Sequence, residues 1–140
     1  MMIVADSNLI IAPVVKKHPF HTRAMAALAQ PLQDGELRLL QHVLIESYSV
    51  LTREPESLRA TPEDAFRALQ GTYGKCAVIS TPLSDVWRFL RARDLRTSGG
   101  AVYDAVIATT AIEAGADRLL TFNSKHFAAF ADQIEIVVPI

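Results

Sequence analysis

Five short apolar runs alternate along this chain with segments of helical periodicity. The runs occupy residues 2–5, 37–40, 76–79, 119–122 and 134–138. Each has the length of a buried strand, and turn-forming residues or helical segments separate them. Strands that alternate with helices form a parallel sheet with helices on both faces. The sequence therefore predicts an α/β fold with a central, mainly parallel sheet of about five strands.

Helix signals lie between these runs. The predicted helices cover residues 9–12, 18–32, 42–53, 62–69, 82–96 and 102–114. Thr61 and Pro62 place a capping side chain before a proline, which is typical of a helix start. Pro13 is expected to end the first helix, and Gly115 to cap the last one. Since the helix at 102–114 is apolar on most of its circumference, we expect it to be a buried element.

Length and composition limit the class of protein. A chain of 140 residues with 50% hydrophobic and 21% charged residues is globular and of single-domain length. Its net charge of −1 excludes attraction to nucleic acid by the molecule as a whole. One cysteine, Cys76, allows no internal disulfide, and neither a signal peptide nor a membrane span is predicted. We therefore expect a cytoplasmic location.

Acidic residues recur within the apolar segments. Asp6 ends the first predicted strand and Asn123 follows the fourth, so both belong to the carboxyl edge of the sheet, where α/β proteins bind ligands. Asp104 is expected in the first turn of the buried helix, and Glu46 in the middle of helix 42–53. Asp117 precedes the fourth strand and belongs to the opposite edge. These positions predict one shared site.

Carboxylates that converge in this way repel one another. Two charges about 4 Å apart cost on the order of 4 kcal/mol at an effective dielectric constant near 20. A divalent cation removes this cost, and a set of oxygen ligands without clustered Cys or His favours magnesium or manganese over zinc. Magnesium held by few carboxylates keeps several waters, which suits attack on a phosphate. The acids therefore predict a metal site for phosphate chemistry.

Each acid also has a simpler interpretation. An Asp after a strand is commonly a turn or cap residue, a Glu in an amphipathic helix is commonly solvated, and Asp104 alone fits a partner of the helix dipole. It is the order of the four residues, on strand end, helix, helix start and strand end, that favours a site.

Basic residues form two groups. The first lies near the loops after the first and fourth strands and consists of Lys16, Lys17, His18, Lys125 and His126. The second makes one helix basic and consists of Arg88, Arg91, Arg93 and Arg96.

Four segments carry a resemblance to a known family. They are residues 3–8, 43–53, 99–108 and 119–123, the last followed by His126 and Phe127. In order and context they resemble the PIN-domain nucleases, most closely the small VapC-like toxins of bacterial toxin–antitoxin pairs. The resemblance covers nearly the whole chain and implies a single PIN-like nuclease domain over 1–140, a three-layer α/β/α sandwich.

The resemblance also implies site residues and partners. The acidic quartet of the family corresponds to Asp6, Glu46, Asp104 and Asn123, where Asn123 replaces the Asp that many members carry. Asp6, Glu46 and Asp104 would bind one or two Mg²⁺ ions, and a metal-activated water would cleave RNA to leave a 5′-phosphate and a 3′-hydroxyl. Ser7 and Asn8 match the family motif and would orient the ligands. Family members are commonly homodimers held by a partner antitoxin.

Two other functions are compatible with parts of this pattern. A receiver-like phosphoacceptor module shares a five-stranded α/β layout, but it would need an acid pair after the first strand, where this chain has Asp6 followed by Ser7 and Asn8. A catalytically silent PIN-like binding protein is the second. The intact Asp6, Glu46 and Asp104 argue against it, whereas Asn123 leaves it open.

Overall fold

The computed structural model describes residues 1–53, 55, 59–81, 86–92 and 99–140 of the chain. The strands within these residues are β1 (Ile3–Ala5), β2 (Arg38–Leu40), β3 (Ala77–Ile79), β4 (Arg118–Leu120) and β5 (Glu135–Val137). The helices are α1 (Ser7–Ile11), α2 (His21–Gln33), α3 (Gln41–Arg53), α4 (Pro62–Tyr73), α5 (Val86–Ala92) and α6 (Gly100–Glu113), with the 3₁₀ helices η1 (Ala12–Val14) and η2 (Ser124–Phe130). Four of the predicted apolar runs contain one strand each, and β4 begins one residue before the run 119–122, which confirms the α/β class.

All strand pairs are parallel, but they form two groups. One has the order β1-β4-β5 and the other pairs β2 with β3. A single bridge between Ile3 and Leu37 joins the groups, and the Ile3 amide donates to the Glu36 carbonyl at 3.0 Å. The predicted single sheet is therefore interrupted. Leu37 is the only residue of the second run that pairs with β1, since β2 begins after it.

The strand order positions the site. From β1 the chain adds β2 and β3 on one side, then returns to place β4 and β5 on the other. The order therefore reverses between β1 and β4, and connections that diverge at such a point leave a crevice beyond the carboxyl ends of the strands. The register pairs Ala5 with Leu120. As a result, the next residues, Asp6 and Thr121, are neighbours at this edge.

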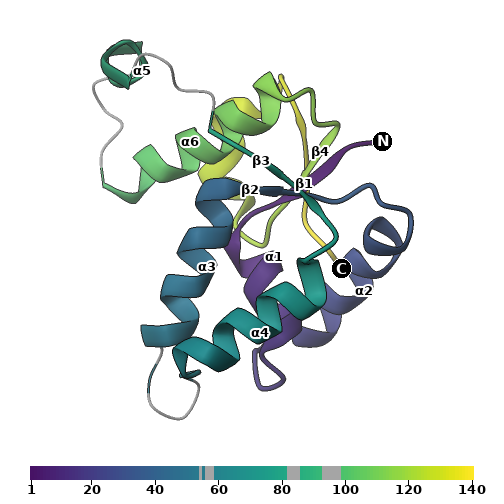
Figure 1. Ribbon diagram of the computed structural model, residues 1–140. Helices are drawn as coiled ribbons and strands as arrows, with labels where there is room; N and C mark the ends of the chain where they lie inside the picture. The colour runs from purple at the N-terminus through teal and green to yellow at the C-terminus, as the bar shows by residue number, and fades with distance from the viewer. Residues whose placement is uncertain (54, 56–58, 82–85, 93–98) are drawn as a thin grey trace.

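Helices cover the strands on both faces, as predicted for a three-layer sandwich. Figure 1 shows α1, α2, α3 and α4 on one side of the strands and α6 on the other, whereas the C-terminus lies beside α2. The core between them is apolar: Val4, Leu9, Leu119 and Ala108 have 0% exposure. Burial of such side chains is the main force that holds the layers together.

Several helix boundaries differ from the prediction. Helix α1 starts at Ser7, two residues early, and ends at Ile11, just before Pro13 as predicted; the chain then continues as η1 with Pro13 near its start, where no amide donor is needed. Helix α4 passes through Gly71 and ends at Tyr73, with the Gly74 amide bonded to the Gln70 carbonyl. Helix α6 starts at Gly100, two residues early. Of the helix predicted at 82–96, the described part is α5, and its predicted ends lie outside the described residues.

The predicted caps at Thr61 and Gly115 are confirmed. The Thr61 hydroxyl accepts from the Asp64 amide at 3.1 Å, which satisfies one of the free donors at the start of α4. Gly115 follows α6 with φ of +80°, a left-handed conformation that glycine adopts without strain. Local chemistry therefore determines these two boundaries.

Candidate active site

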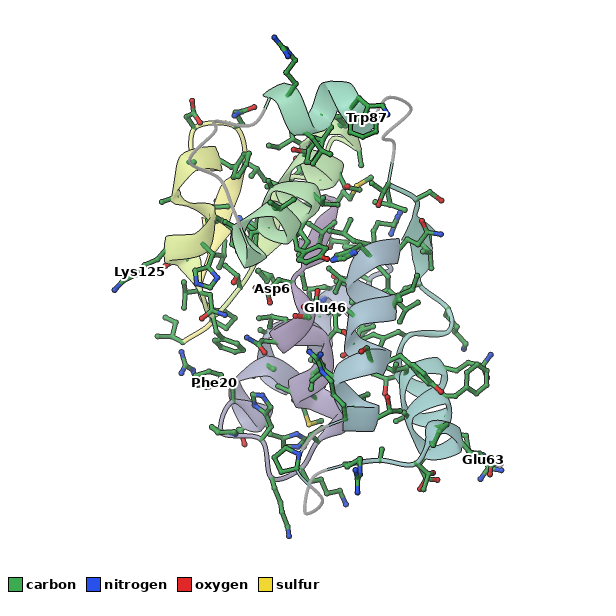
Figure 2. The ribbon with its side chains drawn as sticks, turned by 90° about the vertical axis from the view of Figure 1, so that its left-hand side faces the viewer. Asp6, Phe20, Glu46, Glu63, Trp87 and Lys125 are labelled. Atoms are coloured by element: carbon green, nitrogen blue, oxygen red, sulfur yellow. The ribbon has the colours of Figure 1, made fainter. Side chains whose placement is uncertain are left out.

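The four residues predicted to share a site line one cleft. This cleft has a volume of about 330 Å³ and is bordered by Asp6, Glu46, Asp104 and Asn123, together with Ser7 and Asn8. Figure 2 shows Asp6 and Glu46 beside each other in the middle of one face of the molecule. The cleft lies at the reversal of strand order, where the carboxyl ends of β1 and β4 meet. The structure therefore brings these four residues together at this edge of the sheet.

Asp6 is the buried member of the site, with 6% exposure. Its Oδ1 accepts from the Asn8 amide at 3.1 Å and so caps α1, while its Oδ2 accepts from the Thr121 hydroxyl at 2.5 Å. Burial raises the pKa of the Asp6 carboxyl, and the charge of Asp104 adds to the rise. The hydrogen bonds from Thr121 and from the backbone at Leu9 and Asn8 oppose it.

Thr121 is a site residue that the sequence reasoning missed. Its side chain is fully buried, donates to Asp6 and accepts from the Asn123 amide at 2.9 Å. One hydroxyl therefore holds the carboxylate after β1 and the backbone after β4 in fixed relation. The parallel pairing of the two apolar runs could have indicated it. This pairing places the residues that follow β1 and β4, Asp6 and Thr121, side by side.

Asp104 lies on α6 across the cleft from Asp6. Because α6 begins at Gly100, Asp104 is in the second turn of the helix and not in the first turn as predicted. The helix dipole therefore stabilises its charge less than expected, since that effect is confined to the terminal turn. Burial raises the pKa of the Asp104 carboxyl, and His126 lowers it. The His126 Nδ1 lies 3.4 Å from Asp104 Oδ2, so a protonated His126 would form an ion pair there.

Glu46 enters the cleft from α3, and its side chain is 37% exposed. One turn earlier on the same helix, His42 Nε2 lies 3.6 Å from Glu46 Oε2, beyond hydrogen-bond distance. That nitrogen is buried without a hydrogen-bond partner, and the His42 ring stacks on Tyr103. His42 is thus held mainly by the stack.

Asn123 lies at the rim of the cleft and is exposed. Its backbone is fixed by Thr121, so the amide side chain starts from a defined position. Lys125 follows on η2 and extends into solvent at the edge of this face (Figure 2). Lys16 and Lys17 are exposed as well, but they border a separate hollow with Arg59. Arg91 of α5 is exposed, whereas Arg93 and Arg96 lie outside the described residues.

The arrangement of the carboxylates fits a metal ion that keeps most of its water ligands better than one surrounded by protein ligands. Within the described residues, no group of three or more His, Cys, Asp or Glu side chains is arranged to hold a metal ion. Asp6 and Asp104 nevertheless face each other closely enough for the charge of one to raise the pKa of the other. Magnesium commonly binds through one or two carboxylates and keeps its remaining ligands as water. The two aspartates fit that mode, and Glu46 borders the same cleft.

The chain matches a known protein family over most of its length. A profile of the PIN domain matches residues 3–133, nearly the whole sequence. The chain belongs to the PIN-domain family. Its relatives include Ribonuclease VapC27 of Mycobacterium tuberculosis (strain ATCC 25618 / H37Rv), 34% identical over 79% of this chain and 77% of that protein. Ribonuclease VapC40 of M. tuberculosis (strain CDC 1551 / Oshkosh) is 33% identical over 86% of this chain and 85% of that one. The predicted resemblance to VapC-like PIN proteins is confirmed.

Solved structures show the same PIN fold. The crystal structure of M. tuberculosis VapC20, described as a Sarcin-Ricin loop cleaving toxin, superimposes with a TM-score of 0.67 at 19% identity, covering 91% of this chain and 94% of that one. The structure of FitAB bound to the IR36 DNA fragment superimposes with a TM-score of 0.64 at 17% identity, covering 99% of this chain and 95% of that one. A PIN fold excludes the receiver-like alternative.

Among the described residues, no helix combines the length and the apolar character that a membrane span needs.

Proposed function

We propose that this PIN domain is a Mg²⁺-dependent endoribonuclease that acts as the toxin of a toxin–antitoxin pair. The observation that carries the proposal is the pair of aspartates, Asp6 and Asp104, which face each other in one cleft with raised pKa values. Holding two carboxylates in this way costs stability, and functional sites are where such costs are retained. The named relatives VapC27 and VapC40 are both ribonucleases, which supports RNA as the substrate.

The side chains have different roles in the proposed reaction. Asp6 and Asp104 would hold the ion, and Glu46, which is more exposed, would orient the attacking water and accept its proton. Bound Mg²⁺ supplies a water of lowered pKa and neutralises charge on the phosphoryl oxygens. The products are a 5′-phosphate and a 3′-hydroxyl. Thr121 keeps Asp6 in place through its hydrogen bond, so it is a positioning residue. Manganese has the same preference for oxygen ligands and would substitute for magnesium.

The form of the cleft supports internal cleavage of a strand. Tyr103, Asn123 and His126 are all exposed at its border, so the carboxylates are reached from an open face and not through a closed pocket. A continuous RNA strand can therefore lie across the cleft. The exposed Lys125 supplies positive charge near the acids, and His126 adds to it when protonated, where a phosphate next to the scissile one would pass.

Partner binding is the second part of the proposal. The chain would form a homodimer and bind a cognate antitoxin, as the VapC-like resemblance implies. An apolar hollow of about 370 Å³, bordered by the exposed Ile45, Tyr48, Phe66 and Val78, supplies a surface for protein contact. Because RNA is the proposed substrate, the cytoplasmic location stays part of the same prediction.

A catalytically silent PIN-like binding protein is the alternative. Two observations favour it: the amide at Asn123 and the lack of a preformed three-ligand metal cluster in the described part of the chain. Under this alternative RNA binds without cleavage. The two functions therefore differ in one measurable product.

The deciding experiment is incubation with a panel of transfer and ribosomal RNAs in Mg²⁺ or in EDTA, followed by end mapping. We expect internal cuts in Mg²⁺ with 5′-phosphate ends, and none in EDTA. An Asp132→Asn variant is a matched control, because Asp132 is an exposed aspartate outside the cleft. Cleavage that persists in EDTA would contradict the metal-dependent mechanism, and retention of uncut RNA would favour the silent alternative.

A further inference from the structure

Two aromatic rings from different helices are stacked beside the acidic cleft. The rings of His42 on α3 and Tyr103 on α6 have centroids 5.2 Å apart and planes 12° apart. His42 lies one turn before Glu46, and Tyr103 immediately precedes Asp104. The stack therefore links the two helices that carry carboxylates, at the level of the cleft.

The stack leaves part of Tyr103 open. Tyr103 is 57% exposed although it borders the cleft, whereas the His42 side chain is 31% exposed with its Nε2 buried. Because the planes are nearly parallel, His42 covers one face of the Tyr103 ring. The high exposure of Tyr103 then means that its opposite face is available to a ligand.

Other exposed aromatic side chains are placed differently. Trp87 is 82% exposed, but Figure 2 shows it at the far end of the molecule from Asp6 and Glu46. Tyr48 and Phe66 border the apolar hollow and not the acidic cleft. Among the Phe, Tyr and Trp residues of the described chain, Tyr103 is the one that borders the acidic cleft, and it is exposed.

We propose that Tyr103, backed by His42, is a stacking platform for an RNA base next to the scissile phosphate. The proposal rests on the proposed ribonuclease function and specifies how the substrate is held. Proteins that bind single-stranded RNA stack unpaired bases on aromatic rings, which gives affinity with little sequence preference. A phosphate at Asp6 and Asp104 brings the base of the adjoining nucleotide to the ring that precedes Asp104. His42 fixes that ring beforehand, so less side-chain freedom is lost on binding.

The test compares Tyr103→Leu, Tyr103→Trp and wild type on a short single-stranded RNA that carries 2-aminopurine, whose fluorescence falls when it stacks. Binding is measured in EDTA, so that no cleavage is needed. We expect quenching with wild type and Tyr103→Trp. With Tyr103→Leu we expect little quenching and a Kd raised between roughly 5-fold and 150-fold, as loss of one stacked base predicts. Trp87→Leu is the matched control, since it removes an exposed aromatic side chain away from the acidic cleft and should bind as wild type does.

The outcomes separate this proposal from the function on which it rests. Cleavage in Mg²⁺ without any effect of Tyr103→Leu on Kd, KM or quenching would overturn the platform and leave the ribonuclease intact. Tyrosine-dependent quenching without cleavage in Mg²⁺ would uphold the platform and contradict the nuclease. If Tyr103→Leu altered only the oligomeric state, measured by sedimentation, Tyr103 would be a protein contact and the platform would be wrong. Circular dichroism of each variant verifies that the exposed substitution leaves the fold intact.

Discussion

Helix α3 borders two hollows of similar size and opposite chemistry. Glu46 and Val50 face the acidic cleft of about 330 Å³, whereas Leu44, Ile45 and Tyr48 face the apolar hollow of about 370 Å³. Helical geometry places these two sets on opposite sides of α3. The acidic cleft gathers charges that are costly to bury, and the apolar hollow exposes side chains that are costly to leave in water. In the proposed function, an ion with RNA offsets the first cost and a protein partner offsets the second.

The largest effect should come from the acids. We expect Asp6→Asn or Asp104→Asn to lower RNA cleavage by roughly a hundredfold or more, because losing a metal ligand removes several kcal/mol of transition-state stabilisation. The measurement is the cleavage rate in Mg²⁺, with Asp132→Asn as the exposed control. Full activity in the double variant would show that the acidic cleft is not the reaction centre.

Magnesium should distinguish the two hollows next. A ligand that binds the folded state alone stabilises it, by about 2.7 kcal/mol at a concentration of 100 times its Kd. We therefore expect Mg²⁺ to raise the Tm of the wild type and of the hollow variant Ile45→Ser by several degrees. In Asp6→Asn and Asp104→Asn the rise should be lost. An equal rise in all four proteins would place Mg²⁺ binding outside the acidic cleft.

A change in the wall of the apolar hollow should affect stability and not chemistry. Tyr73 borders that hollow, is 1% exposed, and donates from its hydroxyl to the Ile10 carbonyl on α1 at 2.8 Å. Because Tyr73→Phe leaves this carbonyl unpaired, we expect a loss of about 1–2 kcal/mol in the free energy of unfolding, measured with urea. Cleavage should stay at the wild-type rate below the Tm. A large loss of activity in the folded variant would mean that the two regions are coupled.

The smallest effect is a pH dependence of stability in the metal-free protein. Because burial raises the pKa of Asp6, the folded state binds more protons than the unfolded state between the unfolded pKa, about 3.9, and the folded one. The destabilising contribution of Asp6 is therefore absent below this window and complete above it. The advantage in Tm of Asp6→Asn over the wild type, measured in EDTA, should increase as the pH rises through the window. A difference that stays constant with pH would contradict the burial argument.

Local sequence predicted the presence and type of the helices and strands better than the residues at which they begin and end. Strands followed from apolar runs, and the Thr61 cap followed from side-chain chemistry that acts within a few residues. The start of α6 was predicted two residues late because Gly99 and Gly100 are typical of a loop. Gly99 has φ of +58° and directly precedes the helix, so the loop ends sooner than the composition suggested. Pro13 indicated the end of α1 but not the turn that follows, since a proline at the start of η1 is compatible with a 3₁₀ helix.

The sequence by itself determined the α/β class, the acids at the strand ends and their likeness to PIN-domain proteins, because these depend on residue types and spacings along the chain. Only the tertiary structure decided that the sheet is interrupted beyond Ile3 and that Thr121 holds Asp6. It also placed Tyr103 on His42 beside the cleft. These contacts join residues distant in sequence, and their geometry depends on how strands pair and helices pack. No local pattern contains that information.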